Sequence, residues 1–120
     1  MTEPSGGGGS DKPSDSDILG RLFALIESRR NADPEHSYVA RLLGKGTAKI
    51  AQKFGEEAVE TVIAAALRDR GATIAESADA LFHLLVLWAD QGIAPAEIWR
   101  ELADREGTSG IDEKKARPRK

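Results

Sequence analysis

Apolar residues recur every three to four positions along most of this chain, which is the spacing of one face of an α-helix. Ile18, Leu22, Phe23 and Ile26 form the first such stripe. No segment of the sequence alternates apolar and polar residues, so the pattern predicts no sheet. We expect an all-α fold, an antiparallel bundle of four to five helices joined by short connections. The predicted helices cover roughly residues 15–30, 37–43, 47–69, 73–90 and 95–105.

Glycine and proline mark several of the predicted boundaries. Gly71 is predicted to end the third helix. Pro95 occupies a first-turn position of the last helix, where its missing N–H is tolerated. The predicted caps of the other helices are Ser14 or Asp15, Thr47 and Thr73.

Two of the predicted helices are apolar almost all round. Residues 58–66 read AVETVIAAA and residues 78–89 read ADALFHLLVLWA. Such helices are normally buried, but a chain of 120 residues builds only a modest core. The pattern therefore predicts a homo-oligomer, most simply a two-fold homodimer. Trp88 and Trp99 are expected to fill the core or the dimer interface.

Composition excludes several classes of protein. The formal charge of −3 argues against a nucleic-acid binder, and the absence of cysteine excludes disulfides and thiolate metal sites. No uninterrupted apolar run reaches the ~18 residues that would span a membrane. The N-terminus has no apolar core of a signal peptide. We expect a cytoplasmic protein without membrane or nucleic-acid partners.

The chain divides into three predicted segments. Residues 1–14 are rich in glycine, serine and proline and are predicted to be a disordered tail. Residues 15–107 form the all-α domain. Residues 108–120 are a basic C-terminal tail, which is either solvated surface or a segment that reaches over an anionic ligand.

Carboxylates lie inside both apolar stretches. Burying an unpaired charge there costs roughly several kcal/mol. At 100° per residue, Glu57 and Glu60 share one helix face, and Glu76 and Asp79 share another. If the two helices pack antiparallel, the four acids converge, and Glu56 lies on a flank. Hard oxygen ligands without cysteine favour Mg²⁺, with Mn²⁺ also possible. A di-iron site is less suited because it uses Glu-x-x-His pairs.

Metal ions held by few carboxylates usually keep positions open for substrate phosphates and water. The acidic cluster therefore suggests hydrolysis of a phosphoanhydride. Lys53, one helical turn before Glu57, is placed either to bind a phosphate or to pair with Glu56 or Glu57. His83 follows Asp79 by one turn and is interpreted as its hydrogen-bond partner or as a satisfied core histidine.

The sequence around these acids resembles a known superfamily. KFGEEAVETVIAA followed by ESADALFHLLVLWA is similar to the EExxE…ExxD signature of the MazG-like all-α nucleotide pyrophosphohydrolases. The flanking segments PEHSYVARLLGKGTAKIAQKFGEEAVE and REGTSGIDEK resemble one family within it, the phosphoribosyl-ATP pyrophosphohydrolases of histidine biosynthesis. The resemblance covers roughly residues 17–117.

The resemblance implies magnesium-dependent hydrolysis of phosphoribosyl-ATP to phosphoribosyl-AMP and pyrophosphate. By motif position, the implied metal ligands are Glu57, Glu60, Glu76 and Asp79. Glu56 matches the leading acid of EExxE, with a role beside the ligands or in activating water. The catalytic candidates are thus Glu56 and Glu57.

Selection of this substrate requires groups that bind its additional ribose phosphate, since a metal site recognises only a phosphate chain. The candidates, besides Lys53, are hydroxyl and cationic side chains outside the acidic motif: Ser37, Tyr38, Lys45, Lys49, Lys114, Lys115 and Arg117.

Two other functions remain open from sequence. One is a house-cleaning (d)NTP pyrophosphatase of the same superfamily, which the flanking segments disfavour. The other is a non-catalytic helical dimerisation module whose acids bind a structural ion or nothing.

Overall fold

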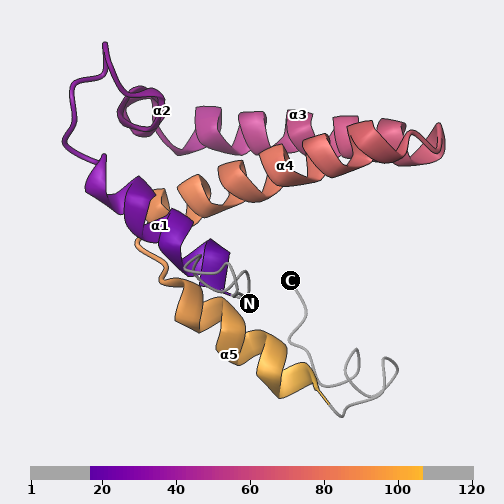
Figure 1. Cartoon of the computed structure of the whole chain (residues 1–120). Coiled ribbons are helices and arrows are strands. Elements are labelled where there is room, and N and C mark those ends of the chain that lie inside the picture. The colour runs from indigo at the N-terminus through magenta and orange to yellow at the C-terminus, as the bar shows by residue number, and fades with distance from the viewer. Residues whose placement is uncertain (1–16, 107–120) are drawn as a thin grey trace, which may run out of the picture.

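The computed structural model describes residues 17–106, and within this range all regular secondary structure is helical (Figure 1). The prediction of an all-α fold is confirmed. Five helices follow one another along the chain: α1 (Ile18–Ser28), α2 (Tyr38–Lys45), α3 (Thr47–Ala66), α4 (Arg70–Gln91) and α5 (Pro95–Arg105).

Helices α3 and α4 form a long antiparallel hairpin that makes one arm of the molecule in Figure 1. At the open end of the hairpin, the Thr47 hydroxyl donates to Asp90 Oδ2 at 2.5 Å, which ties the start of α3 to the end of α4. Antiparallel packing brings the middle of α3 beside the first half of α4. The acidic residues of both helices lie in this region.

The hydrophobic core is concentrated near this open end. Ile50 of α3 and Leu85 and Val86 of α4 are almost fully buried, and they pack with Ile26 of α1 and Leu42 of α2. Burial of side chains of this size contributes about 1.5–3 kcal/mol each. The core thus fixes α1 and α2 to the end of the hairpin that lies beyond the acids.

The turn between α3 and α4 differs from the predicted one. Arg68 adopts a positive φ of 57°, and Asp69 caps α4 by accepting a hydrogen bond from the Ala72 N–H at 3.0 Å. The predictions that Gly71 ends α3 and that Thr73 caps α4 are therefore wrong. The carboxylate of Asp69 accepts from the Ala72 N–H at the start of the helix, so α4 begins before Thr73. Gly71 therefore lies in the first turn of α4.

The remaining boundaries lie close to the predicted ones. Ser14 and Asp15 fall outside the described residues, and α1 begins after Asp17. Gly46, with a φ of 92°, precedes α3, so Thr47 is its first residue and not its cap. The predicted start of α5 at Pro95 is confirmed, and Glu97 Oε2 accepts a hydrogen bond from the Ala94 N–H at 3.0 Å.

Outside the core, a large apolar surface is exposed in the single chain. Val62 of α3 is 67% exposed, and Leu67 at the turn is 74% exposed. The expectation that residues 58–66 are buried is therefore not met within one chain, where Ala64 is the buried member. Helix α5 contacts the rest through an edge-to-face pair of Trp88 and Trp99, whose ring centroids are 6.0 Å apart.

By length and composition alone, α4 is apolar enough to cross a membrane. This is weak support for a membrane span because core helices of soluble proteins can have the same length and composition. Glu76 and Asp79 interrupt the apolar run. The helix packs along α3 and against α1.

Candidate functional site

Three carboxylates from two helices meet on the inner face of the α3–α4 hairpin. Glu57 of α3 and Glu76 and Asp79 of α4 each place one carboxylate oxygen within 4.8 Å of the others. Glu57 and Glu76 are half-buried, and Asp79 is exposed. Helical periodicity brings Glu76 and Asp79 to one face of α4 because residues three apart are neighbours on a helix. We refer to these three residues as the acidic cluster.

Glu60 lies at the edge of this cluster. Burial, together with the neighbouring carboxylates of Glu57 and Glu60, raises the pKa of Glu76 to about 7. Like charges that converge in a partly desolvated place favour protonation of one of them. A bound cation would reverse this effect, because it favours the ionised form of every carboxylate around it.

Two carboxylate oxygen atoms in the cluster have no hydrogen-bond partner within the described part of the chain. Glu57 Oε1 and Glu76 Oε1 are buried and accept no hydrogen bond from any of residues 17–106. A buried acceptor without a partner is costly in a folded protein. Both atoms belong to residues that already converge with Asp79, so a divalent cation with oxygen ligands fits the donor set.

Lys53 and Glu56 flank the cluster on α3. The Lys53 amine lies 3.8 Å from Glu56 Oε1 and 3.9 Å from Glu57 Oε2. The side chain of Glu57 is 13% exposed, whereas that of Glu56 is 48% exposed and accepts a hydrogen bond from Gln52 at 3.0 Å. Lys53 thus balances part of the negative charge while remaining at the mouth of the site.

His83 is 7% exposed and lies one turn beyond Asp79. Its Nδ1 is 2.8 Å from the backbone carbonyl oxygen of Asp79, and its Nε2 is 2.8 Å from the hydroxyl of Tyr38. A carbonyl oxygen only accepts, so Nδ1 carries the proton, and in the neutral ring Nε2 accepts from Tyr38. His83 therefore forms a hydrogen bond with the backbone of Asp79 and not with its carboxylate.

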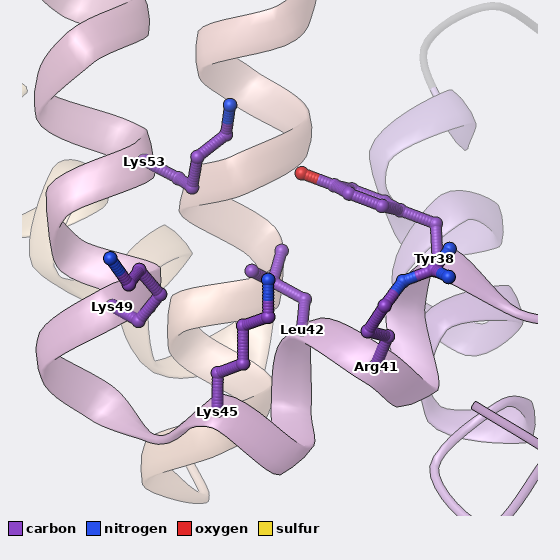
Figure 2. Close-up of a pocket in the computed structure, with 6 residues that line it drawn as sticks. All are labelled: Tyr38, Arg41, Leu42, Lys45, Lys49 and Lys53. Atoms are coloured by element: carbon purple, nitrogen blue, oxygen red, sulfur yellow. The ribbon is translucent and has the colours of Figure 1, made fainter. Parts of the chain in front are cut away.

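The predicted substrate-binding residues fall into three groups. Ser37 caps α2, because its hydroxyl oxygen accepts from the Ala40 N–H at 3.1 Å. Tyr38, Lys45, Lys49 and Lys53 line one pocket between α2 and α3 (Figure 2). The other three predicted residues, Lys114, Lys115 and Arg117, lie outside the described residues.

Sequence reasoning missed Arg41, which lines the same pocket as these lysines. The available signal was its spacing. Arg41 lies three residues after Tyr38 and four before Lys45, so all three share one face of α2. Single cations on exposed helix faces are common. Arg41 differs from them because α3 packs beside α2 and brings two lysines to the same pocket.

The fold and the site together define an all-helical protein with a cluster of carboxylates on a helical hairpin. The chain belongs to the phosphoribosyl-ATP pyrophosphohydrolase family, whose sequence profile matches residues 19–106. A protein of Paramagnetospirillum magneticum named phosphoribosyl-ATP pyrophosphatase is 59% identical over 106 residues, which cover 88% of this chain and 97% of the relative. Proteins of the same name from Azospirillum brasilense and Rhodospirillum rubrum are 62% identical over 100 residues and 55% identical over 105 residues. These matches cover 83% and 88% of this chain, and 90% of each relative.

Proposed function

We propose that this chain hydrolyses phosphoribosyl-ATP to phosphoribosyl-AMP and pyrophosphate in histidine biosynthesis, with Mg²⁺ or Mn²⁺ bound at the acidic cluster. The observation that carries the proposal is the convergence of Glu57, Glu76 and Asp79 within 4.8 Å. Family membership supplies the substrate, since relatives covering most of the chain are named phosphoribosyl-ATP pyrophosphatase.

The metal ligands in this proposal are Glu57, Glu60, Glu76 and Asp79. The unpartnered oxygens of Glu57 and Glu76 support this, because each is a buried acceptor that lacks a donor among residues 17–106. When bound, a divalent cation neutralises phosphate charge and lowers the pKa of water. Glu60 adds a fourth carboxylate beside Glu76.

The chain's own residues then have separate tasks. Lys53, at the mouth of the site, binds the phosphate chain in place of the carboxylates that it faces in the free protein. Glu56 in this proposal accepts a proton from the attacking water, a role supported by its greater exposure than Glu57 and by its hydrogen bond from Gln52. Glu57 supplies a ligand oxygen and helps to hold that water.

The active form in this proposal is a cytoplasmic homodimer. Large apolar side chains are exposed along the hairpin, and a second copy would cover them. A shallow groove on α3 includes Gly55, Val59 and Ile63 but also Glu56 and Glu60, so a second helix packed in this groove would lie beside the proposed active site. The exposed apolar residues of the hairpin are Val59, Val62, Ile63, Leu67, Ile74 and Leu81.

The proposal is tested by incubating the purified protein with phosphoribosyl-ATP and identifying the products by chromatography. We expect phosphoribosyl-AMP and pyrophosphate in equal amounts, no reaction in EDTA, and recovery with Mg²⁺ or Mn²⁺. Full activity in EDTA would refute the metal site. Preference for simple (d)NTPs over phosphoribosyl-ATP would instead identify a house-cleaning pyrophosphatase, and no hydrolysis of any nucleotide would favour a dimerisation module.

A further inference from the structure

A pocket of about 140 Å³ lies between α2 and the first half of α3. Figure 2 shows its cationic side chains extending from both helices around the opening, with Leu42 between them. Leu42 is almost fully buried and forms the base of the pocket. Four of the six lining residues are cations and none is an acid; the six are Tyr38, Arg41, Leu42, Lys45, Lys49 and Lys53. We call this the α2–α3 pocket.

The spacing of the cations is unfavourable for the free protein. Arg41 and Lys45 are four residues apart on α2, and Lys49 and Lys53 are four apart on α3. Like charges at this spacing destabilise a helix, whereas opposite charges stabilise it. Both helices thus present repelling pairs to the same pocket, an arrangement that an anionic ligand would relieve.

Little of this charge is neutralised by residues 17–106. Within residues 17–106, Lys53 is the only pocket cation with an ion pair, and it pairs with Glu56 and Glu57. The Lys49 amine donates to the amide oxygen of Gln52 at 3.3 Å, which leaves its charge uncompensated. No acid of the described segment pairs with Arg41 or Lys45. Their side chains are therefore available to an anion from solvent.

The hydroxyl of Tyr38 does not serve as an anion donor. When His83 is neutral, the Tyr38 hydroxyl donates its proton to His83 Nε2, which lies 2.8 Å from the hydroxyl oxygen. Tyr38 instead forms a wall of the pocket, stacked 6.4 Å from the ring of Phe82. The donors left for a ligand are the guanidinium of Arg41 and the amines of Lys45 and Lys49.

The α2–α3 pocket adjoins the acidic cluster through Lys53. This residue lines the pocket, and its amine is 3.9 Å from Glu57 of the cluster. A ligand with two separate phosphorylated groups can therefore place one at the cluster and the other in the pocket. Under the proposed function, on which this inference rests, the substrate has both a triphosphate and a phosphoribosyl group.

We propose that the α2–α3 pocket binds the phosphate monoester of the phosphoribosyl group, with Arg41 and Lys45 as its principal ligands and Lys49 beside them. The planar guanidinium of Arg41 matches two oxygens of a phosphate at once, and the lysine amines add point charges. The pocket thereby selects phosphoribosyl-ATP over nucleoside triphosphates that lack this group.

The test compares Arg41→Met and Lys45→Met with the wild-type enzyme on phosphoribosyl-ATP and on ATP. Loss of one charge-assisted contact is expected to raise KM for phosphoribosyl-ATP by about ten- to a hundredfold. The value of kcat for phosphoribosyl-ATP should change much less than its KM, and the KM for any hydrolysis of ATP should not show this rise. Arg100→Met, on the exposed face of α5, is the matched control and should leave both parameters unchanged.

A binding measurement separates the pocket from the reaction. Ribose 5-phosphate should bind wild-type protein in calorimetry without Mg²⁺, and Arg41→Met should weaken that binding by at least about tenfold. Equal KM values for wild-type and variant enzymes, or equal rises in KM for both substrates, would overturn the assignment while leaving the proposed function intact. Failure of the wild type to hydrolyse phosphoribosyl-ATP, with ribose 5-phosphate still bound through Arg41, would overturn the proposed function instead.

Discussion

Glu76 lies close to other carboxylates, and this proximity shifts its pKa. Burial and the carboxylates of Glu57 and Glu60 raise its pKa from 4.5 to about 7. Between these values the folded, metal-free protein holds a proton that the unfolded chain has released. The group therefore favours the folded state most below pH 4.5, and this contribution is lost as the pH rises through about 7.

The free energy of unfolding in EDTA should accordingly fall between pH 5 and pH 8, as measured by urea denaturation followed by circular dichroism. Glu76→Gln removes the titrating group and should flatten this part of the curve. With Mg²⁺ present, the trend should reverse, because a cation binds the ionised carboxylates more tightly as the pH rises. Identical pH curves for the wild type and Glu76→Gln would contradict the interpretation.

Neutralising single acids should separate catalysis from folding. Glu57→Gln, Glu60→Gln, Glu76→Gln and Asp79→Asn are each expected to lower kcat by at least about a hundredfold, since even partners behind metal ligands contribute 10–100-fold. The stability of the metal-free protein should stay level or rise, because each change relieves repulsion. Glu101→Gln, an exposed acid paired with Arg105 on α5, is the control. Near-normal kcat in any of the four would remove that residue from the ligand set.

At the scale of the elements, the start of α4 depends on Asp69. Its carboxylate accepts from the Ala72 N–H, and the Thr73 hydroxyl donates to the Asp69 carbonyl at 2.7 Å. Asp69→Ala should lower the free energy of unfolding by about 1 kcal/mol, whereas Asp69→Asn keeps the cap and should cost little. Urea denaturation of both variants provides the measurement. If Thr73→Ala lowered the free energy of unfolding more than Asp69→Ala, Thr73 would be the cap, as predicted from the sequence.

Much of this architecture could be predicted from periodicity. The helices and their antiparallel order follow from apolar stripes and short breaks, and the pairing of Glu57 with Glu76 and Asp79 follows from the same register. The turn was missed because Arg68 takes a left-handed conformation that a non-glycine residue adopts only under local constraint. Gly71 was the stronger signal in sequence, but the cap of Asp69 precedes it.

The cationic pocket could be predicted only in part. Lys45 and Lys49 are predicted as cationic side chains outside the acidic motif, but the contribution of Arg41 depends on how α2 turns against α3 at Gly46. A positive φ at Gly46 directs the chain sharply from one helix into the next. No periodicity within a single helix encodes that angle.

At the scale of the whole molecule, exposed apolar surface predicts association. Val62→Glu and Leu67→Glu place charges on the exposed faces of the hairpin and should shift a dimer towards monomer by light scattering at low micromolar concentration. Gln91→Glu adds the same charge at an exposed polar position and should leave the dimer intact. A wild-type protein that is monomeric under these conditions would refute the proposed homodimer.

The short link between α3 and α4 has a consequence for the order of folding. Residues 67–69 alone join the two helices, so closing the hairpin costs little chain entropy. Contacts between sequence neighbours form fast, and the α3–α4 pairing should precede the docking of α1. The mutually repelling acids would then meet in the earliest structured species. If the proposed cation binds the acidic cluster, divalent cations should accelerate refolding more than they slow unfolding.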